Sequence, residues 1–203
     1  VKVCPFDPPY GQYLGLTDGH YGESGVTPCE CDNAKTADAL QLMKDVLVAM
    51  EPKLASDGVI LLFRPSGNID PYFTELTETV KSAGLAIAHE LVWDKATSRL
   101  GNGRSPYTVG SERIWVIKRQ GDELLNHDGS PTTDVLKFAP VHQGKDSKES
   151  HYFMKPSELC EFLIKKHSYE SELVFDPCGC SGNFCIAAYQ LNRKFVYSEI
   201  NKE

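Results

Sequence analysis

Hydrophobic positions along the chain fall into two patterns, short continuous runs and longer stretches with helical spacing. Residues 59–63 read Val-Ile-Leu-Leu-Phe between turn signals, which is typical of a strand buried on both faces of a sheet. Residues 36–54 instead place apolar side chains three or four positions apart, which predicts a helix. Further strands are predicted at 1–6, 85–93, 114–117, 173–175 and 195–197, and further helices at 70–83, from 156 onward and at 184–191. This alternation predicts an α/β fold, a mostly parallel sheet with helices on both faces.

Two polar stretches interrupt the alternation. Residues 11–35 are rich in glycine and lack apolar periodicity, which predicts a long loop of the functional kind. Residues 120–150 are polar and predict a connecting segment or a small target-recognition segment. The length of 203 residues fits one domain over 1–203.

Composition excludes some classes of protein. Hydrophobic residues make up 41% of the chain and charged residues 24%, as in ordinary globular proteins. No apolar run has the ~18 residues of a membrane span, and no secretion signal is visible, so we expect a cytoplasmic protein. The net charge of -7 argues against strong autonomous binding to nucleic acid, which would require a local basic patch.

The seven cysteines are expected to be free thiols. Two Cys-x-Cys pairs, Cys29/Cys31 and Cys178/Cys180, raise the alternative of a zinc site. Structural zinc sites more often have a longer gap between cysteines, so we predict no metal.

A candidate catalytic motif, Asp7-Pro8-Pro9-Tyr10, follows the first predicted strand. Ligands of open α/β sheets bind at the carboxyl ends of the strands. There, the Asp7 carboxylate and the Pro8 carbonyl can each accept a hydrogen of one exocyclic amine. The ring face of Tyr10, rather than its hydroxyl, is expected to stack on a planar base. The alternative is a strand-ending turn with a solvated aspartate.

A candidate cofactor loop covers residues 175–183, where a strand, a turn of small residues and a helix start follow one another. Gly179 and Gly182 let backbone N–H groups approach a ligand closely. Glu199 ends the next predicted strand, where an acid can accept hydrogen bonds from two ribose hydroxyls. A tight turn that only packs a helix on the sheet is the alternative.

Taken in order, these motifs resemble the DNA amino-methyltransferases of the permuted group, in which the catalytic motif precedes the cofactor motif. Asp7-Pro8-Pro9-Tyr10 resembles the family's catalytic tetrapeptide, and residues 151–156 resemble its His-Pro-Thr-x-Lys-Pro element. Residues 176–183 resemble its Asp-Pro-Phe-x-Gly-Ser-Gly-Thr loop, with Cys178 in place of the Phe and Cys180 in place of the central Gly. The resemblance implies a Rossmann-like methyltransferase fold. Because the chain ends four residues after Glu199, we expect the strand that usually follows to be absent and fewer than seven strands in total.

The resemblance also implies an activity, an adenine-specific DNA methyltransferase of the restriction–modification kind. S-adenosyl-L-methionine would donate methyl to the N6 amine of a flipped adenine by direct displacement. Catalytic roles would fall to Asp7, Pro8 and Tyr10. Cofactor contacts would come from Lys155, Asp176, Cys178, Gly179, Ser181, Gly182 and Glu199.

DNA contacts are expected from the segment between Lys95 and Arg119, which has six basic residues and one acid, Glu112. The basic residues are Lys95, Arg99, Arg104, Arg113, Lys118 and Arg119. A solvated hairpin is the alternative for this segment. For the chain as a whole, a non-catalytic or partner-dependent subunit of the same fold, N4-cytosine methylation and RNA amine methylation stay open. A protein partner or a homodimer also stays open.

Overall fold

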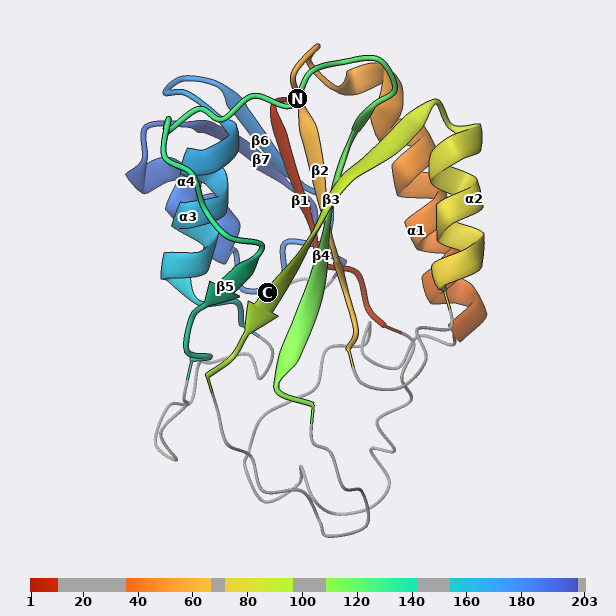
Figure 1. Cartoon of the computed structure of the whole chain (residues 1–203), viewed down its shortest axis with the longest axis horizontal. Coiled ribbons are helices and arrows are strands. Elements are labelled where there is room, and N and C mark those ends of the chain that lie inside the picture. The colour runs from red at the N-terminus through yellow and green to blue at the C-terminus, as the bar shows by residue number, and fades with distance from the viewer. Residues whose placement is uncertain (11–35, 67–71, 97–108, 142–153, 201–203) are drawn as a thin grey trace, which may run out of the picture.

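A single sheet between two layers of helices forms the protein, as Figure 1 shows. The computed structural model describes residues 1–10, 36–66, 72–96, 109–141 and 154–200. Within them the strand order is β5-β3-β4-β2-β1-β6-β7. Of these seven strands, β4 alone runs antiparallel to its neighbours. The predicted mostly parallel α/β sheet is therefore confirmed.

The observed elements follow the predicted ones closely. The strands are β1 (Val3–Phe6), β2 (Val59–Arg64), β3 (Leu85–Asp94), β4 (Ser111–Arg119), β5 (Val135–Lys137), β6 (Leu173–Asp176) and β7 (Lys194–Tyr197). The helices are α1 (Thr36–Met50), α2 (Phe73–Ser82), α3 (Ser157–His167) and α4 (Asn183–Gln190), with a 3-10 turn, η2 (Glu51–Lys53), after α1. The helix predicted over 36–54 thus divides at Met50, because Pro52 cannot continue the α-helical hydrogen bonds. The predicted loop at 11–35 lies outside the described residues.

Strand β2 is buried along its whole length because helices cover both faces of the sheet. Val59, Leu61 and Phe63 pack in one core with residues of α3 and α4. Ile60 and Leu62 point the other way and pack with residues of α1 and α2. The continuous apolar run in the sequence reflects this double coverage.

The number of strands corrects one prediction. We expected fewer than seven, but Val135–Lys137 form β5 and pair in parallel with β3 at the far edge. A three-residue strand inside a polar segment has too little apolar sequence to be recognised, and only pairing with β3 reveals it. At the opposite edge lies β7, whose four residues are all exposed.

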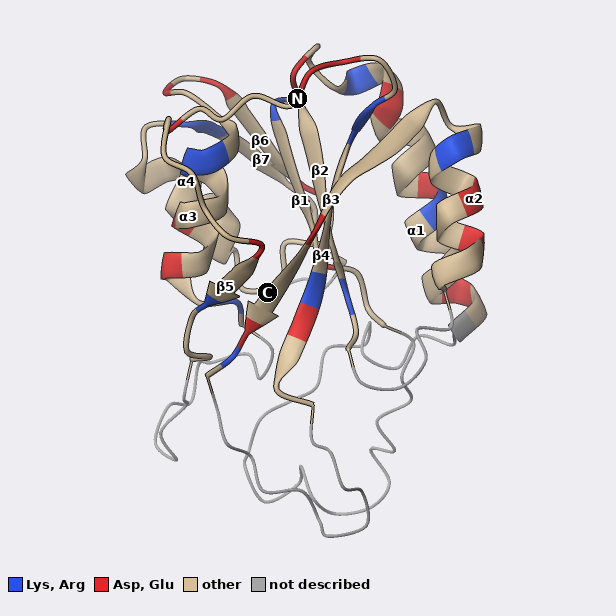
Figure 2. Cartoon of the chain, viewed as in Figure 1, with Lys and Arg blue, Asp and Glu red and all other residues tan. Residues whose placement is uncertain are grey.

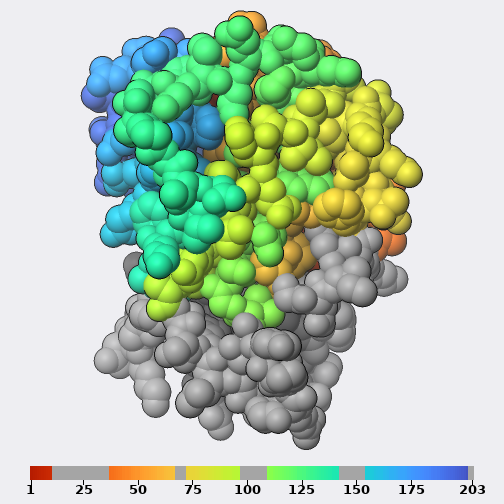
Figure 3. Space-filling model, viewed as in Figure 1, coloured from red at the N-terminus to blue at the C-terminus, as the bar shows by residue number. Residues whose placement is uncertain are grey.

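Residues 120–141 lie across the surface of the fold, as the green and teal atoms of Figure 3 show. The Trp93 indole donates a hydrogen bond to the Phe138 carbonyl (2.8 Å), and the Lys166 ammonium of α3 pairs with Asp128 (2.7 Å). This described part of the predicted recognition segment is therefore packed onto the sheet and α3. Residues 142–150 lie outside the described residues. Among the described helices, none combines the length and apolarity that crossing a membrane requires.

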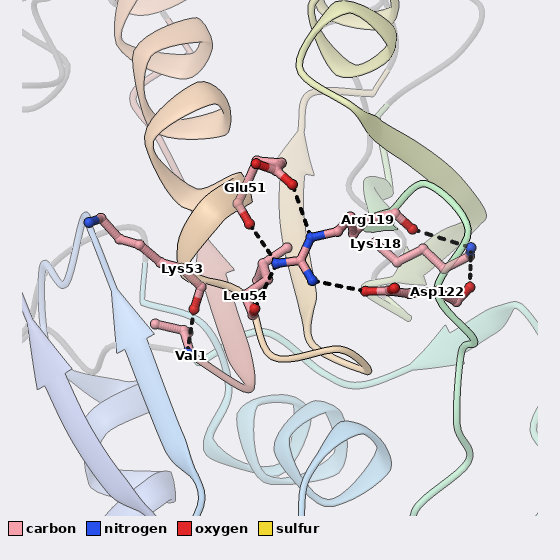
Figure 4. A network of polar contacts seen from close by, with 7 residues as sticks. All are labelled: Val1, Glu51, Lys53, Leu54, Lys118, Arg119 and Asp122. Atoms are coloured by element: carbon pink, nitrogen blue, oxygen red, sulfur yellow. Dashed lines mark hydrogen bonds and ion pairs between the residues drawn. The ribbon is translucent and has the colours of Figure 1, made fainter.

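Arg119 and Lys118 join the end of β4 to neighbouring turns, as Figure 4 shows. The Arg119 guanidinium donates to the Glu51 carboxylate (2.9 Å) and to the carbonyls of Glu51 (3.0 Å) and Leu54 (2.8 Å). Lys118 donates to the Asp122 carbonyl (2.6 Å). Lys118 also pairs with Val59, at the start of β2, which places this cluster at the amino ends of the parallel strands. The DNA-contact prediction is therefore wrong for Lys118 and Arg119, which lie at the end of the sheet remote from Asp7 and stabilise the fold.

Arg119→Met is expected to lower the free energy of unfolding by about 1–3 kcal/mol, because the two carbonyls lose a charged donor. Urea denaturation would measure this change. DNA affinity at a fixed salt concentration should not change, and a weaker salt dependence in the variant would restore Arg119 as a phosphate contact.

Candidate active site at the carboxyl ends of β1 and β6

The topology brings the two predicted motifs together. β1 and β6 are neighbouring parallel strands, so Asp7, just after β1, and Asp176, the last residue of β6, lie at the same end of the sheet, where the parallel strands finish. The antiparallel β4 begins at this end and contributes Glu112. Lys155 arrives from the segment that leads into α3.

Asp7 has a donor on each carboxylate oxygen. The Lys155 ammonium lies 2.6 Å from Oδ2, and the Tyr10 hydroxyl donates to Oδ1 at 3.1 Å. Pro8 is buried next to it, and the Tyr72 hydroxyl fixes the turn by donating to the Tyr10 carbonyl (2.5 Å). Asp7 is thus held by specific side-chain contacts and is not the solvated aspartate of the alternative interpretation.

The Tyr10 hydroxyl makes contacts that the sequence did not predict. We assigned the function of Tyr10 to its ring face, yet its hydroxyl reaches both Asp7 (3.1 Å) and Glu112 (3.2 Å). The sequence could not show this bond, because Glu112 is 102 residues away. Tyr10 therefore orients Asp7 in addition to presenting a ring.

Glu112 is the site residue that sequence reasoning did not assign. Its Oε2 lies 3.2 Å from the Lys155 ammonium, and its Oε1 lies 2.7 Å from the Lys95 ammonium. Asp7, Lys155, Glu112 and Lys95 thus form a chain of alternating charge. The available signal was that Glu112 is the single acid in a basic segment, a pattern that we used only to predict DNA contact.

Burial and the ion pairs act on the pKa of each acid differently. Burial raises the pKa of Asp7 above its ordinary value, although the Lys155 ammonium opposes the change. For Glu112 burial is again the largest influence, but Lys155 and Lys95 together outweigh it and the pKa is lowered. The charge of Lys155 is opposed by burial and maintained by attraction to Asp7 and Glu112, so its pKa lies above the ordinary value.

The candidate cofactor loop is a tight turn between β6 and α4. The Gly179 N–H donates to the Ser198 carbonyl (2.9 Å), and a Cβ at Gly179 would lie 2.6 Å from the Tyr197 ring. Gly182 adopts a left-handed conformation (φ 73°) at the start of α4. Ser181 lies half exposed between them. Gly179 thus allows the loop to pack closely against β7, as the packing alternative requires, whereas Gly182 serves the left-handed backbone conformation.

Glu199 reaches across to the same loop. Its Oε2 accepts the backbone N–H of Cys180 at 2.7 Å, which joins the end of β7 to the turn after β6. Cys180 is exposed and adopts a positive φ of 43°, which a non-glycine residue rarely adopts. The turn is therefore strained at Cys180, and Glu199 stabilises it.

Asp176 and Cys178 lie beneath the loop. Asp176 is buried and accepts the Cys178 backbone N–H at 3.0 Å, and burial raises its pKa to about 7. Burial likewise raises the pKa of the Cys178 thiol to about 12, so this thiol is neutral at physiological pH. The described residues contain no group of three or more His, Cys, Asp or Glu side chains that could hold a metal ion. Cys29 and Cys31 lie outside the described residues.

The remaining basic residues of the predicted DNA patch divide into three groups. Lys95 is committed to Glu112, and Arg113 lies 3.3 Å from the Glu90 carboxylate and is 42% exposed at its side chain. Arg99 and Arg104 lie outside the described residues. Figure 2 shows basic and acidic positions interspersed along α1 and α2. Among the described basic residues predicted to contact DNA, Arg113 is thus the one that lies near the candidate site and has an exposed side chain.

Comparison with known proteins decides the family. The model of the N6_N4_Mtase family, described as DNA methylase, matches residues 1–203. The chain belongs to this family. The prediction of a DNA amino-methyltransferase family is thereby confirmed, whereas the family name covers both N6 and N4 amines and so does not choose between adenine and cytosine.

Several curated relatives of this chain are type II methyltransferases. M.HhaII of Haemophilus parahaemolyticus is 27% identical over 212 residues, which cover 97% of this chain and 81% of that protein. M1.MboII of Moraxella bovis is 23% identical over 188 residues, 74% of this chain and 70% of that protein. M.HpaI of Haemophilus parainfluenzae is 31% identical over 97 residues, 48% of this chain and 31% of that protein. The chain thus spans about a third of the length of M.HpaI.

Solved structures share the fold of this chain. The M1.HpyAVI–SAM complex has a TM-score of 0.66 at 18% identity and covers 100% of this chain and 84% of its own. The PvuII DNA methyltransferase, described as cytosine-N4-specific, has a TM-score of 0.73 at 16% identity and covers 99% and 75%. These similarities confirm the predicted Rossmann-like methyltransferase fold.

Proposed function

We propose that this chain transfers methyl from S-adenosyl-L-methionine to the exocyclic N6 amine of adenine in DNA, as a member of the permuted group. The observation that carries the proposal is the half-buried Asp7 carboxylate at the carboxyl end of β1. The glycine loop follows the neighbouring strand β6, and Glu199 follows β7, the next strand along. The name of the family supports an amine of adenine or cytosine as the acceptor. Asp at position 7, where the cytosine enzymes more often carry Ser, favours adenine.

The residues around the loop fit the cofactor. S-adenosyl-L-methionine is cationic at its sulfonium and amino groups and carries a ribose diol. Asp176 offers a buried acid and Glu199 a half-buried one on either side of a loop that Gly179 keeps close to β7. Cys178, Ser181 and Gly182 complete the same turn, and the Lys155 carbonyl lies beside it, bonded to Asn183 (2.6 Å). When bound, the cofactor supplies an electrophilic methyl on a positive sulfur.

Asp7 and the Pro8 carbonyl would each accept one hydrogen of the target amine. This arrangement draws the nitrogen lone pair out of conjugation and aims it at the methyl carbon. The cofactor, held by Asp176, Glu199 and the loop between them, would supply the methyl to the nitrogen and would leave as a neutral thioether. The cationic amine then loses one proton to the Asp7 carboxylate. Much of the acceleration would come from position and from preorganised acceptors.

DNA is the proposed substrate, and the target base must leave the stack to reach Asp7. Tyr10 would offset part of that cost by stacking, which is worth ~1–3 kcal/mol in single-strand complexes. Arg113 is the described basic residue best placed to contact a phosphate near the site, and Arg99 and Arg104 stay candidates.

The direct test is incorporation of tritiated methyl from S-adenosyl-L-methionine into unmethylated duplex DNA, followed by digestion to nucleosides. N6-methyladenine is the expected product. N4-methylcytosine would shift the substrate to cytosine, and methylation of RNA alone would shift it to RNA. Cofactor binding without any transfer would favour a non-catalytic or partner-dependent subunit.

Cofactor affinity is expected to depend on pH through Asp176. Its pKa of about 7 means that the free protein holds a neutral carboxyl below that pH, whereas a cationic cofactor favours the carboxylate. Binding therefore releases a proton, and affinity should fall by up to about tenfold for each pH unit below 7. Calorimetry between about pH 5.5 and 8 would measure the slope, and Asp176→Asn should flatten it. An equal slope in the variant would remove Asp176 from the cofactor site.

A further inference from the structure

The two donors on Asp7 share a second acceptor. The Lys155 ammonium lies 2.6 Å from Asp7 Oδ2 and 3.2 Å from Glu112 Oε2. The Tyr10 hydroxyl lies 3.1 Å from Asp7 Oδ1 and 3.2 Å from the same Glu112 oxygen. Every described donor to Asp7 can therefore transfer to Glu112 with little movement.

We propose that the Lys155 ammonium occupies the place of the target amine on Asp7 and moves to Glu112 when the base enters. The inference rests on the proposed function, because it assumes that Asp7 binds an amine. An ammonium and an exocyclic amine offer Asp7 the same N–H donor, so one can replace the other. Lys155 and Glu112 are then positioning residues that act through Asp7.

The Glu112 carboxylate is already oriented to accept the Lys155 ammonium. Its other oxygen, Oε1, is fixed by the Lys95 ammonium at 2.7 Å, so the carboxylate need not turn to accept the incoming donors. The exchange moves no net charge into or out of the buried site. A buried ammonium that lost Asp7 with no second carboxylate nearby would carry a large desolvation cost.

Aromatic rings surround the path of the ammonium. Lys155 Nζ lies 5.0 Å from the centroid of the Phe63 ring and 5.9 Å from that of Trp93. Both distances lie within the range at which a ring face attracts a cation. The rings thus add a weak attraction for the ammonium beside the two carboxylates.

If the exchange occurs, removing Lys155 and removing Glu112 should shift the acid limb of the pH–rate profile, the rise in rate with pH, in opposite directions. Loss of the Lys155 cation raises the pKa of Asp7, so the carboxylate and the activity appear at higher pH. Loss of the Glu112 anion lowers it. The other titratable groups that face this cluster are Tyr10, Lys95, Cys160, Asp176 and Cys178. Lys155 also lowers the pKa of Asp176, so Lys155→Met shifts both acids in the same direction. The downward shift in Glu112→Gln is therefore the one that reports on Asp7.

The test compares Lys155→Met and Glu112→Gln with Lys2→Met in the full chain. Lys2 is a matched control, because it is a buried lysine (4% exposed) that pairs with two carboxylates, Asp57 and Glu172. It directly precedes β1 at the end of the sheet opposite Asp7. Single-turnover methyl transfer to duplex DNA is measured against pH, together with the affinity for S-adenosyl-L-methionine.

Lys155→Met should move the acid limb up by about one pH unit or more, with a high-pH plateau within about tenfold of the parent. Glu112→Gln should move the limb down and slow transfer about tenfold or more, because the donors lose their second carboxylate. Lys2→Met should leave the limb in place. The proposal would be overturned if the acid limb stayed in place in both Lys155→Met and Glu112→Gln. It would also be overturned if Lys155→Met left the limb in place but reduced cofactor affinity about tenfold, because Lys155 would then be a cofactor residue.

The exchange itself is tested by binding. DNA in which purine, which lacks the amine, replaces the target adenine should bind the parent almost as well as adenine DNA, because the amine only replaces Lys155. In Lys155→Met at high pH, the preference for adenine should increase at least ~threefold. An unchanged preference would show that Lys155 does not compete with the base.

Failure of the proposed methyltransferase function can be distinguished from failure of the exchange between Lys155 and the base. A parent chain that binds cofactor but never transfers methyl would refute that function. The titration of the Asp7 carboxyl carbon by NMR, in the parent and the three variants, would then still show whether Lys155 and Glu112 shift the pKa of Asp7 in opposite directions.

Discussion

Replacing Asp7 with asparagine is expected to reduce methyl transfer by roughly 10²–10⁴-fold. Asparagine keeps one acceptor and the shape of the side chain, but it removes the charge that attracts the amine hydrogens and later takes the proton. The loss should fall on kcat rather than on KM, because the interaction strengthens in the transition state. Tritiated methyl transfer under single-turnover conditions would measure it.

The control for Asp7→Asn is Asp57→Asn. Asp57 also pairs with a buried lysine, Lys2, but at the opposite end of the sheet. Both variants remove one carboxylate from a buried ion pair, so a common change in the unfolding temperature reports the structural part. Cofactor affinity should stay within about threefold of the parent in both. Transfer that survives in Asp7→Asn would refute the proposed role of Asp7.

Glu199→Ala is expected to weaken binding of S-adenosyl-L-methionine by about 10- to 150-fold, equivalent to ~1.5–3 kcal/mol. Two losses combine here. The proposed hydrogen bonds to the ribose disappear, and the Cys180 N–H loses the carboxylate that orders the turn (2.7 Å). Isothermal titration calorimetry would measure the affinity.

Glu199→Gln separates these two losses. Its side-chain carbonyl can still accept the Cys180 N–H, while it contacts the ribose without charge. We expect an affinity between those of the parent and Glu199→Ala. Equal affinity in all three proteins would remove Glu199 from the cofactor site and leave it a purely structural bond to the loop.

The described residues explain why the sheet could be predicted from the sequence. The apolar run of β2 follows directly from coverage on both faces, and Gly179 and Gly182 mark a turn that few other residues could form. The short β5 could not be predicted in this way, because its three residues include two that are exposed and its pairing with β3 spans some forty residues of chain. Local patterns report burial and turns, whereas pairing between distant segments leaves little local trace.

Residues of the candidate site were likewise predictable where the signal was local, and not where it depended on distant pairing. Asp7 and Asp176 were recognised because each directly follows or ends an apolar strand, and adjacency of β1 and β6 confirmed that they share an edge. Lys118 and Arg119 were misassigned because they stand close in sequence to Lys95, although β4 carries them to the opposite end of the sheet. A strand of nine residues is long enough to separate the two ends of one basic segment.

The class of fold, the chain order of the strands and helices other than β5, and the two turns that bear the candidate chemistry could be predicted from local sequence. These features depend on local burial and on backbone conformation, which the identities of neighbouring residues control. The position of Glu112 beside Asp7, with Lys155 between them, depends on tertiary packing and left no local signal. That arrangement results from the antiparallel insertion of β4 next to β2, and the stability of a buried ion pair depends on partners that the chain brings together from more than one hundred residues apart.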